Sequence, residues 1–559
     1  MTPPSVKTGR HAIIEQFMLD GMPYMFGNPG TVEQGFLDAL EDYADFKYIL
    51  TLQETIAVAM ADGYARALNH PALVQLHSSV GVGNGIGMLY QAMRGHAPLV
   101  VIAGEAGTQY DSMDAQMAVD LVAMARPVTK YATRVIEPQS LLRVLRRAIK
   151  IAATPPCGPV FISLPMDVLD APITEEIRPT TTVHTQVTPP IEQLQEAANW
   201  LAAAQNPLIL MGDGIAFSGA QAELAAVAEA VGAPVWGVNS SEVNLPASHP
   251  LFAGLTGHMF GETSKRIVED ADVILVSGTY LFPEVFPSLK RPFAEDARII
   301  HIDLSPYEMA KNFEVDLALL GDPRSALGVL AGLLNVHMGA EQKTAAHERT
   351  RLHQQKKLSQ EQEQKNRDQE EMQKGHATMA AFAATLAELA PENTILFDEA
   401  LTSSPALNRY LPAEKPGHFF QTRGGSLGVG IPGALGIQLA RPDSTVVAFT
   451  GDGGSMYTIQ ALWTAVHHQI PAKFVVCNNG AYQLLKNNID QYWKEQGIEA
   501  HGHPKSFELI SPVIDFAQVS QGMHVPALKV QRIEDIRPAI EQMLAHNGPF
   551  LIDLVLTES

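Results

Sequence analysis

A glycine–aspartate–glycine triplet, Gly451-Asp452-Gly453, is followed after 24 residues by the pair Asn478-Asn479. Each segment comes directly after a short apolar run, Val446–Phe449 or Phe474–Val476, which is typical of a buried parallel strand. Glycines let the backbone approach phosphate oxygens closely, and carboxylate and amide oxygens are ligands that Mg²⁺ prefers. The spacing therefore predicts a site for a diphosphate that is held through a divalent metal ion.

Two other glycine-rich segments lack the features that such a site needs. Gly212-Asp213-Gly214 also follows an apolar run, but no asparagine pair follows it at the matching distance. We therefore interpret it as a turn. In Gly81–Gly87, Ile86 stands where a dinucleotide-binding motif has its third glycine, so that motif is not predicted.

Two residues that could take part in proton transfer lie in the first third of the chain. Glu54 opens the helical pattern Glu54–Ala67, where a carboxylate is also favourable for structural reasons at a helix N-terminus. His77 follows the apolar run Ala72–Leu76, and the carboxyl ends of such strands collect reactive groups in α/β proteins. Because histidine exchanges protons near neutral pH, His77 is a catalytic candidate, with the capping of a turn as the alternative.

Short β-branched runs alternate with helical patterns along the whole chain, which predicts an α/β protein with parallel sheets flanked by helices. The predicted domains cover residues 1–180, 190–335 and 376–559. A polar connector over residues 336–375 is predicted between the second and the third. Ile173–Pro190 is rich in Pro and Thr and predicts a linker. Glu341–Lys374 has no apolar stripe, so it is either a solvated helix or disordered.

The composition excludes several classes of function. The 559 residues carry 39 Lys and Arg against 60 Asp and Glu, and a net charge of −21 does not favour binding to nucleic acid. No segment approaches the roughly 20 apolar residues that span a bilayer, so no membrane association is expected. Two cysteines, Cys157 and Cys477, cannot form a disulfide framework, and we expect a cytoplasmic protein.

The pairing of Gly451-Asp452-Gly453 with Asn478-Asn479 resembles the diphosphate-binding motif of thiamin diphosphate (ThDP) enzymes. The resemblance covers nearly the whole chain, in the family's order of pyrimidine-binding, middle and diphosphate-binding domains. The chain is most similar to benzoylformate decarboxylases, and it shares features with acetolactate synthases and benzaldehyde lyases. The segments that carry the similarity to the decarboxylases are Phe26–Gly30, Leu52–Glu54, Leu76–Ser78 and Ala461–Ala465.

The resemblance implies that Mg²⁺ is bound by Asp452, Asn479 and the backbone carbonyl of Ala481. The residues that it implies for ThDP are Glu54, Gly425, Leu427, Gly453, Gly454, Ser455 and Asn479. In the family, the glutamate hydrogen-bonds the pyrimidine ring, and a large apolar residue at the position of Leu427 supports the bent cofactor. In the family, the cofactor lies between the first domain of one chain and the third domain of another. We therefore expect at least a homodimer, and by the resemblance a homotetramer.

The resemblance favours decarboxylation of a 2-oxo acid, by ylid attack on the keto carbon and a carbanion-enamine intermediate. His77 matches a catalytic histidine of benzoylformate decarboxylases, and Thr31 stands where they have a serine that contacts the substrate carboxylate. No histidine near Tyr280–Val285 matches their second one. The alternative is a carboligase or lyase that makes or breaks 2-hydroxyketones from aldehydes or pyruvate. It is favoured by Gln116, which aligns with a glutamine that acetolactate synthases and benzaldehyde lyases place beside the thiazolium.

The resemblance also implies a substrate pocket for a small 2-oxo acid or aldehyde. Its residues are Thr31, His77, Leu401, Leu484 and Asn488. Leu484 and Asn488 stand where the decarboxylases have a small residue and an aromatic one, which predicts a narrower or more polar pocket. The side chain of the substrate stays open. A non-catalytic binding protein on this fold is a third hypothesis, which the presence of Glu54, Asp452 and Asn479 disfavours.

Overall fold

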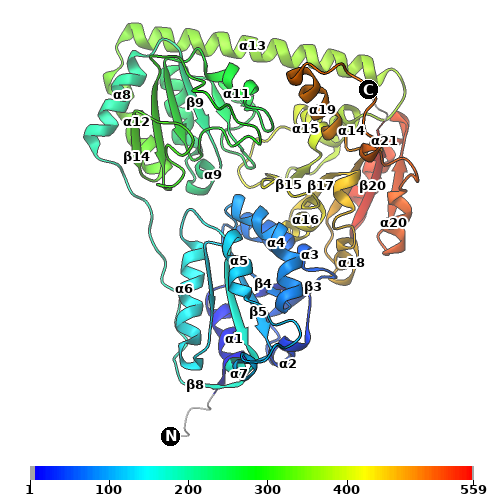
Figure 1. Ribbon diagram of the computed structural model, residues 1–559. Helices are drawn as coiled ribbons and strands as arrows, with labels where there is room; N and C mark the ends of the chain where they lie inside the picture. Colours follow the sequence, from blue (N-terminus) through cyan, green and yellow to red (C-terminus); the bar gives the residue numbers. More distant parts are fainter. Residues whose placement is uncertain (1–6, 557–559) are drawn as a thin grey trace.

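A computed structural model describes residues 7–556, which form three α/β domains in chain order (Figure 1). Each domain contains a six-stranded sheet in which all strands are parallel. This confirms the three-domain α/β fold predicted from the alternation of apolar runs and helical patterns. Residues 1–6 and 557–559, which the predicted domain ranges include, lie outside the described residues.

The first sheet has the strand order β3-β2-β4-β5-β7-β6. Its strands are β2 Tyr24–Gly27, β3 Lys47–Leu50, β4 Ala72–Leu76, β5 Leu99–Glu105, β6 Tyr131–Arg134 and β7 Val160–Pro165. Helix α3 (Glu54–Leu68) follows β3, and α4 (Ser78–Arg94) follows β4. Glu54 therefore lies just beyond the carboxyl end of β3, and His77 lies just beyond that of β4 in the same sheet, as the apolar run Ala72–Leu76 predicted for His77.

The middle sheet has the order β11-β10-β9-β12-β13-β14. Its strands are β9 Pro207–Met211, β10 Val235–Gly237, β11 Phe252–Leu255, β12 Val273–Ser277, β13 Arg298–Asp303 and β14 Leu317–Leu320. Gly212-Asp213-Gly214 is the turn between β9 and helix α9 (Gly214–Ser218), as interpreted from the sequence. Asp213 has an additional role, because its buried carboxylate lies 2.8 Å from Arg423 of the third domain and joins the two domains.

The third sheet has the order β16-β15-β17-β18-β20-β19. Its strands are β15 Thr394–Glu399, β16 Phe419–Gln421, β17 Thr445–Gly451, β18 Lys473–Asn478, β19 Ala527–Val530 and β20 Phe550–Val555. Helix α18 (Ala461–His467) lies in the connection between β17 and β18, which are parallel neighbours. The two halves of the predicted metal site therefore follow adjacent strands.

The polar stretch whose order the sequence left open is helix α13 (Ala340–Met372), which crosses from the middle domain to the third domain (Figure 1). Arg349 donates to the carbonyl of Val231 at 2.6 Å, and Arg409 of the third domain pairs with Asp368 at 2.7 Å. The helix thus connects the two domains through polar contacts at its surface. No helix within residues 7–556 combines the length and the apolar character needed to cross a membrane.

The first and third domains are held together by α3 and α16 (Gly430–Ala440), which lie against each other. Glycines make the approach possible: a Cβ at Gly63 would lie 2.2 Å from the Gly433 carbonyl oxygen, and one at Gly436 would lie 1.9 Å from that of Met60. One hydrophobic core contains residues of both domains. This packing fixes α3, with Glu54 at its start, against the third domain.

Candidate active site

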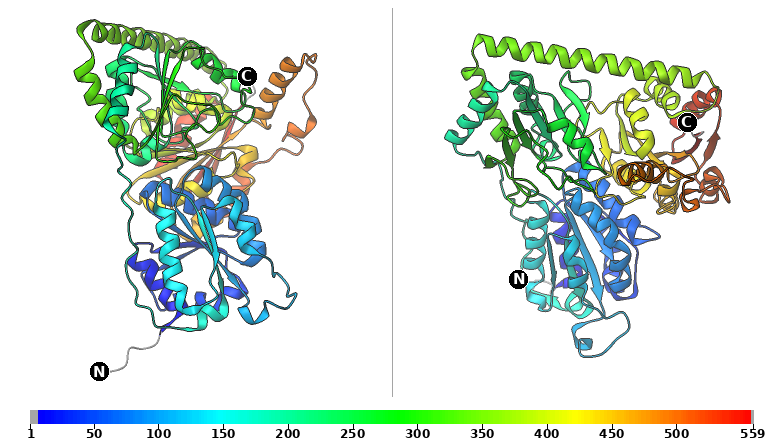
Figure 2. Two further views of the ribbon diagram at one scale, coloured as in Figure 1. Left: turned by 60° about the vertical axis from the view of Figure 1, so that its left-hand side comes forward. Right: turned by 45° about the horizontal axis from the view of Figure 1, so that its top comes forward.

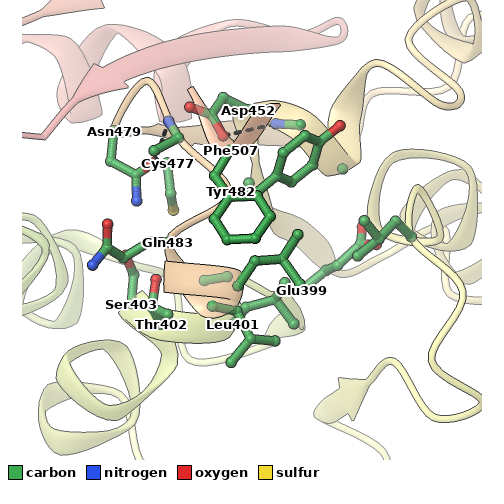
Figure 3. A pocket seen from close by; sticks show the side chains of 18 of the residues that line it. Glu399, Leu401, Thr402, Ser403, Asp452, Cys477, Asn479, Tyr482, Gln483 and Phe507 are labelled. Carbon is green, nitrogen blue, oxygen red and sulfur yellow. Dashed lines mark hydrogen bonds between the residues drawn. The ribbon is translucent and has the colours of Figure 1, made fainter. Parts of the chain in front are cut away.

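A cavity of about 370 Å³ lies at the carboxyl ends of β15, β17 and β18 (Figure 3). The predicted site residues that line it are Leu401, Leu427, Asp452, Gly453, Gly454, Asn479, Ala481 and Leu484. Figure 3 shows Asp452 and Asn479 on one side of the cavity and Leu401 on the opposite side. The structure thus brings together the metal, cofactor and substrate candidates of the third domain.

Asp452 connects the loops that follow β17 and β18. Its Oδ1 accepts the backbone N–H of Gly453, and its Oδ2 accepts that of Gly480, both at 2.7 Å. The amide oxygen of Asn479 accepts the N–H of Ala481 at 3.0 Å. Burial raises the pKa of Asp452, and the backbone N–H groups oppose that shift. These hydrogen bonds place the three predicted metal ligands on one wall of the cavity.

The residues of this wall fit a metal-bound diphosphate. A Cβ at Gly451 would meet no protein atom within 4 Å, so the wall is open there, whereas one at Gly453 would lie 2.3 Å from Tyr482. The described residues that line the cavity include no Lys, Arg or His. Residues 7–556 also contain no cluster of three His, Cys, Asp or Glu that could hold a metal alone. A bound diphosphate would therefore need a cation to balance its charge, and that cation would need phosphate or water oxygens to complete its coordination.

Three predicted residues of the third domain do not line the cavity. Ser455 is fully buried, and its hydroxyl donates to the carbonyl of Asp452 at 2.9 Å. Gly425, with a φ of +80°, belongs to the loop that leads to Leu427. Asn488 lies one turn beyond Leu484 on α19 (Gln483–Gln496), a helix that stands away from the rest of its domain (Figure 2).

Glu54 begins α3 and is 7% exposed. Its Oε2 accepts a hydrogen bond from Asn84 at 3.0 Å, and Gly81 lies so close that a Cβ there would be 3.0 Å from Oε1. Glu54 does not line the cavity of the third domain. Among the hydrogen bonds and ion pairs of residues 7–556, none joins it to Asp452. Within one chain, Glu54 therefore neither lines the cavity that contains Asp452 nor bonds to that residue.

His77 pairs with a buried carboxylate that the sequence analysis did not identify. Its Nδ1 lies 2.8 Å from Oε2 of Glu33, which is 3% exposed and whose Oε1 accepts the Gly104 N–H at 2.9 Å. Burial raises the pKa of Glu33, while the hydrogen bond to His77 acts in the opposite direction. A Cβ at Gly30 would lie 1.8 Å from His77 Nδ1, so the loop requires glycine there. The only feature of the sequence that could have pointed to Glu33 as a site residue is its position two residues after Thr31.

Gln116 lies in a second cavity, of about 520 Å³, in the first domain. Val32 and Ser78, the chain neighbours of Thr31 and His77, line the same cavity. Thr31 is exposed in the 3-10 helix η1 (Thr31–Glu33). The structure therefore places Gln116 near the segment that carries His77, but not in the cavity that contains Asp452.

Family models identify the class of protein that this fold and these sites define. The N-terminal TPP (thiamine pyrophosphate, or ThDP) binding domain of thiamine pyrophosphate enzymes matches residues 7–124, and their central domain matches residues 194–330. Their C-terminal TPP binding domain matches residues 402–554. The chain belongs to the thiamine pyrophosphate enzyme family.

Individual relatives include both decarboxylases and synthases. Benzoylformate decarboxylase of Pseudomonas aeruginosa is 31% identical over 555 residues, which cover 98% of this chain and 99% of that protein. A protein of Methanocaldococcus jannaschii named probable acetolactate synthase large subunit is 28% identical over 567 residues, with 98% and 92% coverage. Among solved structures, the ThDP-dependent 4-hydroxybenzoylformate decarboxylase of Rhodococcus jostii RHA1 superposes with a TM-score of 0.84 at 27% identity, covering 99% of this chain and all of that one.

Proposed function

We propose that this protein is a ThDP- and Mg²⁺-dependent decarboxylase of a 2-oxo acid. The observation that carries the proposal is the pair formed by the buried Glu33 and the half-buried His77, just beyond the carboxyl ends of β2 and β4. The similarity of the whole chain to benzoylformate decarboxylase supports it. A histidine held by a buried carboxylate has one fixed tautomer and can transfer protons at a defined atom.

The proposed roles follow the positions of the side chains. Asp452, Asn479 and the Ala481 carbonyl would bind Mg²⁺, and the remaining cofactor residues would be Glu54, Gly425, Leu427, Gly453, Gly454 and Ser455. ThDP, when bound, supplies a carbon nucleophile and an electron sink. Thr31 would orient the substrate carboxylate, and His77 Nε2 would exchange a proton with the reacting substrate. The substrate side chain would contact Leu401, Leu484 and Asn488.

The proposal requires Glu54 of one chain and Asp452 of another, because Glu54 does not line the cavity that contains Asp452 of its own chain. Exposed apolar side chains lie near both half-sites, Val80 in the first domain and Tyr457 in the third, which supports an interface there. A homotetramer and a cytoplasmic location stay predictions. Mixing subunits of inactive Glu54→Ala and Asp452→Ala variants tests the shared site. Random pairing should restore about a quarter of wild-type activity, and no restoration would contradict a site shared between chains.

Carboligation is the second candidate, and the position of Gln116 favours it. Gln116 shares a cavity with Ser78, the neighbour of His77. A neutral amide can hydrogen-bond a carbonyl oxygen without donating a proton to carbon. This reaction would give 2-hydroxyketones from paired aldehydes or from pyruvate.

One experiment separates the two reactions. CO₂ release is measured from aromatic and aliphatic 2-oxo acids, with and without ThDP and Mg²⁺, and the products are searched for hydroxyketones. We expect CO₂ and free aldehyde that depend on both cofactors. Coupled product would favour the carboligase, and no turnover of any member would contradict the proposed decarboxylase.

A further inference from the structure

Glu399 is a buried carboxylate at the carboxyl end of β15 and lines the cavity that contains Asp452. Its Oε1 accepts the backbone N–H groups of Gly428 at 2.6 Å and Val429 at 3.2 Å. Its Oε2 accepts the N–H of Gly430 at 2.7 Å and the hydroxyl of Thr450 at 3.1 Å. One side chain thus connects the strand β15, the loop before α16 and the strand β17.

These contacts involve the backbone directly after Leu427. The three N–H groups belong to the three residues that follow it in the chain, and Thr450 directly precedes the Gly451-Asp452-Gly453 triplet. One carboxylate therefore fixes the backbone that follows Leu427 relative to the strand that leads into Gly451-Asp452-Gly453.

The surroundings of Glu399 are not those of a buried ion pair. Within the described residues, no Lys, Arg or His forms a salt bridge or hydrogen bond with it, and burial raises its pKa to about 7. The loop is shaped around the carboxylate: Gly428 has a φ of +85°, and a Cβ at Gly430 would lie 2.8 Å from Oε2. Burying a carboxylate only to fill space would cost free energy, because an apolar side chain would fill the same space without desolvating a charge.

We propose that Glu399 is a positioning residue of the cofactor site, which holds Leu427 in the orientation that supports bound ThDP. This inference rests on the proposed function, since it takes Leu427 as the residue that contacts the cofactor. It assigns to Glu399 no contact with the reacting atoms.

The variant Glu399→Gln tests the proposal, because an amide keeps the size but only one of the two acceptor oxygens. ThDP binding to the Mg²⁺-loaded protein is measured by calorimetry without substrate, so the result does not depend on turnover. We expect the dissociation constant for ThDP to rise about tenfold. We expect the same from Leu427→Ala, and the double variant should be no weaker than the worse single variant.

The matched control is Asp398→Asn. Asp398 is the neighbouring buried carboxylate of β15, and it accepts hydrogen bonds from Ala400 N–H at 2.9 Å and the Ser404 hydroxyl at 2.7 Å. This variant should lower the melting temperature. Any change that it causes in the dissociation constant for ThDP should add to the change caused by Leu427→Ala.

Three results would overturn the inference, and they differ in what they say about the proposed function. Additive effects of Glu399→Gln and Leu427→Ala, or unchanged ThDP affinity in the Glu399 variant, would overturn it and leave the proposed function intact. Failure of the wild-type protein to bind ThDP would overturn both.

Discussion

Replacing Glu33 by Gln tests how His77 is held. The amide has the shape of the carboxylate but only one acceptor oxygen, while Glu33 accepts hydrogen bonds from both Gly104 N–H and His77 Nδ1. If the amide oxygen accepts from Gly104, its NH₂ group faces Nδ1, and the ring proton must move to Nε2. His77 would then lose the tautomer in which Nε2 can accept a proton.

The expected loss follows from the change in the hydrogen bond. A bond to a charged partner contributes about 1.5–3 kcal/mol and a neutral one about 0.5–1.5 kcal/mol, so the substitution costs about 1–2 kcal/mol. That difference corresponds to a fall of about 5–30-fold in kcat/KM. The measurement is the rate of CO₂ release from a 2-oxo acid that the wild-type protein uses. The dissociation constant for ThDP is the control and should not change.

The double variant with His77→Ala decides whether Glu33 acts through His77. If it does, Glu33→Gln should have almost no further effect once the imidazole is absent. A kcat/KM for Glu33→Gln within about twofold of wild type, or an additive loss in the double variant, would refute the reasoning.

Three further predictions concern the contacts between domains. Gly63→Ala should destabilise the protein by about 3 kcal/mol, seen as a lower melting temperature, because its Cβ would lie 2.2 Å from a backbone oxygen that cannot move. Glu242 of the middle domain pairs with Arg66 of α3 at 3.1 Å. Burial raises the pKa of Glu242 from 4.5 to about 7, so the stabilisation present below pH 4.5 is lost as the pH rises through 7. Denaturant unfolding of Glu242→Gln should show its stability relative to wild type rising by up to about 3 kcal/mol between pH 5 and 8. Arg409→Ala should lower the midpoint of urea unfolding, with a cost of about 1–3 kcal/mol, because it removes the guanidinium that pairs with the half-buried carboxylate of Asp368.

The parts of the molecule that could be predicted from the sequence depend on local patterns. Apolar runs such as Ala72–Leu76 and Phe474–Val476 are buried strands of parallel sheets, and such strands are recognisable because both faces are covered. The metal-site candidates Asp452 and Asn479 could be placed together because they follow two adjacent parallel strands. The order of the polar stretch was not predictable, since α13 is stabilised by contacts of Arg349 and Asp368 with distant residues.

The residues that the sequence analysis missed all act through partners far away in the chain. Glu33 meets His77 from a separate loop, and Glu399 meets backbone groups about 30 residues further on. Asp213 was interpreted as part of a turn, which it is, but its partner Arg423 belongs to another domain. Carboxylates of this kind have no local signature, because an exposed and a buried glutamate look the same in a sequence.

The docking of α3 against α16 bears on how the active site is completed. The helices touch at Met60 and Gly63, two turns after Glu54, and the approach is so close that a Cβ at Gly436 would lie 1.9 Å from the Met60 carbonyl oxygen. Helices packed through backbone atoms cannot slide past each other without breaking that contact. This packing holds Glu54, at the start of α3, in a position where it does not line the cavity that contains Asp452 of the same chain. The proposed function then requires a second chain to supply the carboxylate, and the mixing of Glu54→Ala and Asp452→Ala subunits measures that requirement directly.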